Sequence, residues 1–247
     1  GIDPLDLAVM SHAVSMIAEE MGTVLERGSL SPNIRERRDA SSAIFDAGGR
    51  MIAQAAHIPV HLGAMPEAVR AVRERNPEPG DLFLLNDPYH GGSHLPDLTM
   101  VEAIAHDGDI VGFAAVRAHH ADVGGMSPGS MPQGATELVQ EGLILPPMRL
   151  VRRGSLDESL LELVLANVRT PGERRGDLAA QRGACAAGAA GWRVLLAREG
   201  SARLSAACDA LLDYAERRTA ARLAAIGHAV GRADDILERD GFSDDPV

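Results

Sequence analysis

An Asp-Gly pair, Asp107-Gly108, separates two runs of strand-forming residues and constrains the fold more than any other feature of the sequence. The runs "LTMVEAIAH" and "DIVGFAAVRAHH" flank it, and Asp-Gly between such runs is typical of a two-residue β-hairpin. With the turn centred there, the numbers of antiparallel partners sum to about 215. Asp97 then lies opposite Ala118, and His94 opposite Ala121. The hairpin therefore brings "HLPD" and "HHAD" together at its open end.

These two segments contain five side chains that commonly bind metals: His94, Asp97, His119, His120 and Asp122. Residues on opposing strands lie about 5 Å apart, so imidazoles and carboxylates at this end can share one cation. Such a ligand set suits Zn²⁺ or Mn²⁺, with Fe²⁺ also compatible. A metal-bound water ionises near neutral pH and becomes a nucleophile. The alternative is that the same side chains hold turns by hydrogen bonds at the solvated end of a sheet.

Other polar residues are weaker candidates. In "HIPVHLG", His57 and His61 either line the cleft or are structural, because the intervening proline forbids a regular helix. His90 lies in the loop and could contact substrate. Glu141 precedes an apolar run that we expect to be a strand, and it is a candidate general base or a strand-edge carboxylate. Asp39, in "RERRD", is by itself part of a solvated charge run.

The patterns predict an α+β fold with a mixed or antiparallel sheet. Residues 1–154 form a mixed α/β region that contains the metal site, residues 155–230 form a helical region, and residues 231–247 begin a further β segment that is cut off. Ser155, with Glu158 three residues later, is the expected N-cap of the first helix of the helical region.

Within these regions, apolar spacing predicts a helix over residues 5–25, and turn signals predict a hairpin over 41–54. Residues 82–85 read as a buried strand. Two alanine-rich helices are expected to end at Gly200 and Gly227, where glycine would stand just past each helix.

Composition limits the functional class. The 247 residues carry a net charge of −11, which argues against nucleic-acid binding and against docking to an anionic membrane. No run of apolar residues is long enough to span a bilayer, and the N-terminus does not resemble a secretory signal. The two cysteines, Cys185 and Cys208, lack a metal-binding spacing and are expected to be buried free thiols of a cytoplasmic protein.

Four separated segments, in order, resemble the hydantoinase B/5-oxoprolinase family. They are "SPNIRERRDASSAIFDAGGRMIAQAAHIPVHLGAMPEAV", "GDLFLLNDPYHGGSHLPDLT", "RAHHADVGG" and "EGLILPP". The family includes N-methylhydantoinase B subunits, the C-terminal half of 5-oxoprolinase, a caprolactamase subunit and the alpha subunit of acetone carboxylases. Family members are longer, so we expect this chain to be truncated relative to them.

The resemblance implies a metal-dependent hydrolase that opens hydantoin, 5-oxoproline or lactam rings as the B-type part of a hetero-oligomer. An A-type partner would bind ATP and phosphorylate the substrate; this sequence contains no nucleotide motif of its own. It also implies that His94, Asp97 and His119 hold the metal and that Asp39 lies at the same centre. His120 and Asp122 are then expected to act in catalysis or contact substrate.

Two alternatives remain. One is a carboxylase subunit of the acetone carboxylase type; "HHAD" and "GGSHLPD" favour the hydrolase branch, because the carboxylase pattern at these places differs. The other is a non-catalytic scaffold for an A-type partner. Metal content separates the scaffold from the two enzymes, and ring opening with ATP and the partner separates the enzymes from each other.

Overall fold

The computed structural model describes residues 2–61, 63–227 and 230–234. Within them one seven-stranded sheet has the order β2-β1-β5-β4-β3-β6-β7, and every neighbouring pair is antiparallel. The strands are β1 (Ala40–Asp46), β2 (Met51–Ala56), β3 (Leu82–Leu85), β4 (Asp97–His106), β5 (Asp109–His119), β6 (Met148–Arg152) and β7 (Ser155–Leu156). The predicted α+β class with an antiparallel sheet is confirmed.

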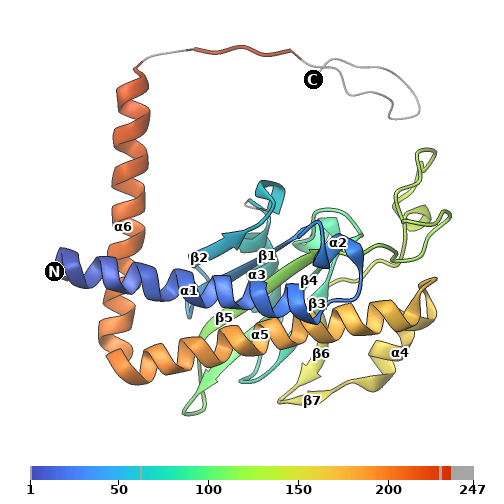
Figure 1. Cartoon of the computed structure of the whole chain (residues 1–247), viewed down its shortest axis with the longest axis horizontal. Coiled ribbons are helices and arrows are strands. Elements are labelled where there is room, and N and C mark those ends of the chain that lie inside the picture. Colours follow the sequence, from blue (N-terminus) through green and yellow to red (C-terminus); the bar gives the residue numbers. More distant parts are fainter. Residues whose placement is uncertain (1, 62, 228–229, 235–247) are drawn as a thin grey trace.

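Helices cover both faces of this sheet (Figure 1). Two long helices, α1 and α5, pack against each other and lie across one face, while the shorter α3 lies on the other. Helix α6 follows α5 and projects beyond the sheet, with burial confined to its first turns. The α-helices are α1 (Pro4–Gly28), α2 (Pro32–Arg35), α3 (Met65–Arg73), α4 (Glu158–Ala166), α5 (Pro171–Glu199) and α6 (Ser201–Ile226); the 3₁₀ helices are η1 (Pro59–His61), η2 (Pro88–His90) and η3 (Leu138–Gln140).

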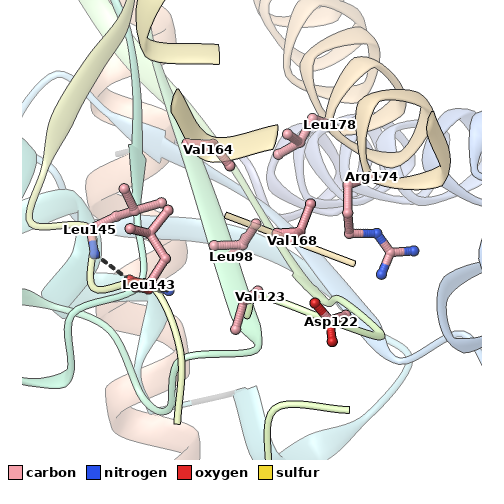
Figure 2. A pocket seen from close by; sticks show the side chains of 10 residues that line it. Leu98, Asp122, Val123, Leu143, Leu145, Val164, Val168, Arg174 and Leu178 are labelled. Carbon is pink, nitrogen blue, oxygen red and sulfur yellow. Dashed lines mark hydrogen bonds between the residues drawn. The ribbon is translucent and has the colours of Figure 1, made fainter. Parts of the chain in front are cut away.

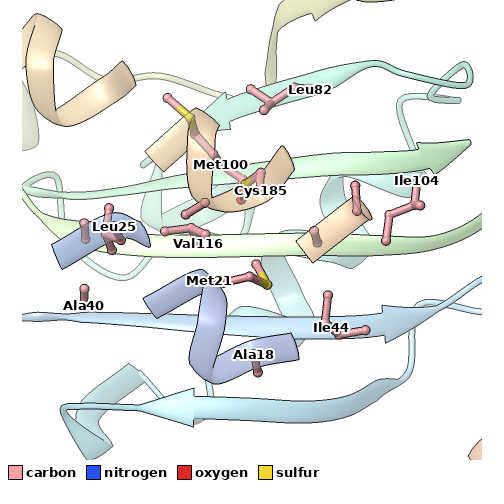
Figure 3. Close-up of a cluster of buried hydrophobic side chains, with 14 of the residues drawn as sticks. Ala18, Met21, Leu25, Ala40, Ile44, Leu82, Met100, Ile104, Val116 and Cys185 are labelled. Carbon is pink, nitrogen blue, oxygen red and sulfur yellow. Dashed lines mark hydrogen bonds between the residues drawn. The ribbon is translucent and has the colours of Figure 1, made fainter. Parts of the chain in front are cut away.

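Strand alternation sorts the core into two layers. Even-numbered residues of the central strands, such as Ile44, Met100 and Val116, point to the α1 and α5 side and pack on Met21 and Cys185 (Figure 3). Odd-numbered residues near the hairpin turn pack against α3; they are Ala43, Phe45, Val101, Ala103, Phe113 and Ala115. The same odd-numbered face becomes polar toward the open end of the hairpin.

The β4–β5 hairpin forms as predicted. Asp107 and Gly108 have positive φ angles of 51° and 90°, as a type I′ turn requires. The predicted register, however, is wrong by one residue at the open end, because Val111 is an extra residue in β5 and forms a β-bulge. Asp97 therefore pairs with His119 rather than with Ala118.

The bulge is stabilised by a residue far along the chain. The indole nitrogen of Trp192, in α5, donates a hydrogen bond of 3.0 Å to the carbonyl oxygen of Val111. Gly112 makes room for the indole: a Cβ atom there would lie 3.0 Å from Trp192 Nε1 and 2.6 Å from the carbonyl oxygen of Phe45. A contact from the helical layer thus supports the bulge on which the register of the hairpin depends.

Two local predictions are corrected. Ser155 does not cap α4; it lies in β7, and the Asp157 side chain caps the helix by accepting from the Leu160 backbone. The apolar run after Glu141 is not a strand, because the Asn86 side chain takes up its backbone groups, accepting from Leu145 N–H and donating to the Leu143 carbonyl.

Other predictions are confirmed. The hairpin over 41–54 appears as β1 and β2, and β3 occupies the predicted residues. The alanine-rich helices end at Gly200 and Gly227. Cys185 and Cys208 are free and buried.

The remaining predictions on organisation concern the chain ends and the membrane. Residues 235–247, which hold most of the predicted further β segment, lie outside the described residues. Among the helices that the structure describes, none has a stretch long and apolar enough to cross a lipid bilayer.

Candidate metal centre

Three predicted ligands meet at the open end of the hairpin. One ligand atom each from His94, Asp97 and His119 lies within 4.8 Å of the others. Asp97 Oδ1 is 2.8 Å from His94 Nε2 and 3.2 Å from His119 Nδ1. The two imidazole rings are 5.1 Å apart between centroids. The structure therefore gathers one carboxylate oxygen and two imidazole nitrogens around a common point.

Each of these side chains is presented by a different element. Asp97 begins β4 and His119 ends β5, and their direct pairing follows from the bulge described above. His94 comes from the loop between η2 and β4, whose course depends on Gly91. Gly91 has a φ of 93°, and a Cβ there would lie 2.8 Å from Ala68 Cα in α3. Glycine at this position lets the loop pack closely on α3 and still deliver His94.

Charge at the centre is unevenly distributed. Burial alone would raise the pKa of Asp97, but its contacts with His119, His61 and His94 outweigh burial and hold that pKa well below its usual range. The hydrogen bond to Asp97 raises the pKa of His94, and the charges of Asp39 and Glu141 act in the same direction. Asp97 is thus an ionised carboxylate in a buried position, which is the state that a metal ligand requires.

A third imidazole reaches the cluster from the segment after β2. His61 is 2% exposed, and its Nε2 atom lies 3.5 Å from Asp97 Oδ2 and 3.8 Å from Asp39 Oδ1. Its Nδ1 atom is 3.0 Å from the Ser41 hydroxyl. His61 thereby lies near both Asp97 and Asp39, and Asp39 stays outside the tight group of three.

A buried arginine lies two residues before His119 on the same face. Arg117 donates from Nε to Thr99 Oγ1 at 2.8 Å and from Nη2 to the Gly91 carbonyl oxygen at 3.0 Å. Its Nη1 atom is buried and has no hydrogen-bond partner among the described residues. Arg117 thus ties the His94 loop to the strand that carries His119.

His120 does not join the cluster, because successive side chains of a strand point to opposite faces. It is fully buried on the α5 side, with Nε2 2.7 Å from Gln181 Oε1. Gln181 in turn donates to the carbonyl oxygens of Leu98 and Val116. Burial lowers the pKa of His120 to about 4, so it is neutral at physiological pH.

Asp122 is also separate from the cluster and is paired with Arg169. It accepts from the Arg169 backbone at 3.0 Å and from its guanidinium at 2.9 Å, and from the Gly124 backbone at 3.0 Å. Burial alone would raise the pKa of Asp122, but these hydrogen bonds lower it. Figure 2 shows Asp122 beside Arg174 at a mostly apolar pocket that Leu98 and Val123 also line. The hydrogen bonds of Asp122 with Arg169 and Gly124 organise the loop after β5.

The remaining candidates are spread around the centre. His57 points toward α1, where its Nε2 atom faces Gly22. His90 is exposed and bonds Asp87 through Nδ1 at 2.6 Å. Glu141 follows η3, and its charge is near enough to raise the pKa of His94. The structure therefore brings His61 into the site and leaves His57 out of it.

Three residues of the site were not identified from the sequence: Ser41, Ser93 and Arg117. Ser93 donates to Asp97 Oδ2 at 2.8 Å. Arg117 lies two residues before His119 in β5, and Ser41, in β1, lies two residues after Asp39, which directly precedes that strand. Period-two alternation places such residues on one face. This alternation is the sequence signal that could have identified Ser41 and Arg117.

The donor set fits a divalent cation. Zinc binds histidine nitrogen and carboxylate oxygen at about 2.0–2.2 Å, so its ligand atoms lie roughly 3–4 Å apart. The separations of 2.8 Å and 3.2 Å between Asp97 Oδ1 and the imidazole nitrogens are close to this range. The Asp97 oxygens also divide their contacts, since Oδ1 faces His94 and His119 while Oδ2 faces Ser93 and His61.

Comparison with known proteins gives consistent matches. The sequence profile described as hydantoinase B/oxoprolinase matches residues 3–247. The chain is 39% identical to the uncharacterized protein MJ0963 of Methanocaldococcus jannaschii over 243 residues, which cover 96% of this chain and 43% of that protein. It is 41% identical to 5-oxoprolinase of Dictyostelium discoideum over 183 residues, covering 73% of this chain and 14% of that enzyme.

A solved structure agrees with these sequence matches. The ATP-dependent caprolactamase from Pseudomonas jessenii superposes with a TM-score of 0.86 at 33% identity, over 94% of this chain and 40% of the caprolactamase chain. The chain therefore spans less than half the length of each of these proteins.

Proposed function

Because the chain belongs to the hydantoinase B/oxoprolinase family, we propose that it is the metal-dependent hydrolytic part of an ATP-dependent cyclic amide hydrolase. The convergence of His94, Asp97 and His119 is the observation that carries the proposal. The names of two matched proteins, a 5-oxoprolinase and an ATP-dependent caprolactamase, support a ring-opening reaction on a cyclic amide. Hydantoin, 5-oxoproline and lactams are the substrate classes that we propose.

The chain's own residues would bind and orient in this reaction. His94, Asp97 and His119 would hold Zn²⁺, Mn²⁺ or Fe²⁺, with Asp39 beside them. Such an ion supplies Lewis-acid activation of a carbonyl oxygen. Glu141, which follows η3, is the carboxylate that we propose as proton acceptor. His120 and Asp122 face other partners and would support the site from outside it.

A partner would supply the ATP-dependent step. An amide carbonyl is a poor electrophile, and phosphorylation of the carbonyl oxygen of the cyclic amide by an A-type subunit would activate it. We therefore propose a hetero-oligomer with a hydantoinase A-type subunit. The two free cysteines favour the cytoplasm as its location.

Metal content and ring opening test the proposal together. The purified protein should carry about one divalent ion per chain, measured by elemental analysis, and should open a cyclic amide with ATP and the A-type partner. His94→Ala should lose both properties, while His106→Ala, at the far end of the same hairpin, should keep them. Full metal content and turnover in His94→Ala would refute the assignment, and ketone carboxylation without ring opening would favour the carboxylase alternative.

A further inference from the structure

A chain of polar contacts runs from β1 through His61 to the candidate ligands. The Ser41 hydroxyl lies 3.0 Å from His61 Nδ1, and both side chains are buried. On the other side of the ring, Nε2 faces Asp97 Oδ2 at 3.5 Å and Asp39 Oδ1 at 3.8 Å. One imidazole therefore stands between a hydroxyl and two carboxylates.

The partners determine where the imidazole proton lies. An ionised carboxylate only accepts hydrogen bonds, so a neutral ring facing two of them keeps its proton on Nε2. Nδ1 is then an acceptor, and the Ser41 hydroxyl is a donor that can satisfy it. The carboxylates thus favour the tautomer in which His61 presents an N–H group to Asp97 and Asp39, and the Ser41 hydroxyl satisfies the other ring nitrogen.

Asp97 uses its two oxygens for different purposes. Oδ1 faces His94 and His119, whereas Oδ2 faces Ser93 at 2.8 Å and His61 at 3.5 Å. Donors on Oδ2 fix the rotation of the carboxylate and leave Oδ1 directed at the common point. Residues that contact a metal ligand from outside the coordination sphere, as Ser93 and His61 contact Asp97, commonly orient that ligand.

We infer that His61, held by its contact with Ser41, is a positioning residue that orients Asp97 and Asp39 toward the bound metal. The inference rests on the proposed metal centre. It assigns to His61 a role that differs from contact with substrate, because the side chain is 2% exposed and its two nitrogens face Ser41 and the two carboxylates. It also gives a function to Ser41, which lies two residues after Asp39 on the same face.

Metal affinity of variants of the full chain tests this inference. Zinc or manganese dissociation constants would be measured by competition with a chelator, and folding by circular dichroism. His61→Leu should weaken metal binding by about 10- to 100-fold, the usual effect of losing a partner behind a ligand. His61→Gln keeps a donor near the Nε2 position and should retain most of the affinity. Ser41→Ala should lie between the two, since it removes the polar partner of His61 Nδ1 and keeps the ring.

His57→Gln is the matched control, because His57 lies four residues earlier and faces α1 instead of the cluster. It should bind metal as the unmodified protein does. Unchanged affinity in His61→Leu would overturn the inference and leave the metal centre standing, whereas failure of the unmodified protein to bind metal would refute the centre itself. Equal loss in His61→Gln and His61→Leu would identify His61 as a direct ligand and overturn its positioning role. If His61→Leu does not fold, unchanged metal affinity in Ser41→Ala refutes the inference that Ser41 and His61 position the carboxylates.

Discussion

Trp192→Phe tests whether a tertiary contact stabilises the bulge on which the register at the candidate metal centre depends. Trp192 is 1% exposed, and its indole N–H donates to the carbonyl oxygen of the bulged residue Val111. Phenylalanine fills most of the space but cannot donate. An unsatisfied buried carbonyl costs about 1–3 kcal/mol, and the lost ring volume adds about 1 kcal/mol. We therefore expect a loss of about 3 kcal/mol in the free energy of unfolding.

For a chain of this size, 1 kcal/mol corresponds to roughly 2–4 °C in the midpoint of thermal unfolding, so the expected decrease is about 6–12 °C. Far-UV circular dichroism is the suitable probe, because Trp192 is the only tryptophan and its fluorescence is lost with it. Val194→Ala, on the same helix and 68% exposed, is the control and should change stability by less than about 0.5 kcal/mol.

A deletion variant separates the hydrogen bond from the packing. Deleting Val111 removes the extra residue of β5. The pairs on both sides of the bulge, including Asp97 with His119, should keep their partners, because the bulge adds only that one residue. In that background Trp192→Phe should cost about 1–2 kcal/mol less, because its acceptor is gone. If Trp192→Phe is no more destabilising than Val194→Ala, the indole does not stabilise the bulge.

Three further predictions concern the site and its support. Asp97→Asn preserves shape but removes the charge, and isothermal titration should show loss of divalent-metal binding with folding retained. Gly91→Ala should cost about 2 kcal/mol or more and weaken metal binding, because its φ is 93° and the new Cβ meets Ala68; Gly129→Ala, with a φ of 86° and open space around it, should cost less and bind metal normally. Burial raises the pKa of Glu102, so its contribution to stability falls as pH rises from the unfolded-state pKa through the folded-state pKa. Glu102→Gln should accordingly be more stable than the unmodified protein at neutral pH in urea titrations, with the difference disappearing below about pH 4.

Much of the fold was predictable because its signals are local. Asp107-Gly108 determines a type I′ turn by backbone preference alone, and the apolar spacing of α1 is visible without any partner. The bulge was not predictable, since Val111 is accommodated by an indole some eighty residues later in the chain. The start of α4 was misplaced because Ser155 and Asp157 are both good capping residues, and pairing of β7 with β6 decides between them.

In the candidate site, too, some residues could be predicted from local sequence signals and others could not. The predicted hairpin gathers His94, Asp97 and His119 with two other candidates at its open end, and the family resemblance singles out these three as the implied metal ligands. The sequence does not decide between two roles for His61, because the turn around η1 determines where its ring points and the sequence only forbids a regular helix there. Ser41 was missed because a serine in a buried strand has no distinctive pattern.

The register matters because function and core share one face of the sheet. Odd-numbered residues of β1, β4 and β5 are apolar where α3 covers them. Toward the open end of the hairpin they are polar: Thr99 pairs with Arg117 across the two strands, and His119 lies two residues after Arg117. A slip of one residue in β5 would turn His119 toward α5 and bring His120 to the metal side. The hydrophobic layer would be inverted by the same slip, so the burial that stabilises the sheet also selects which of two adjacent histidines faces Asp97.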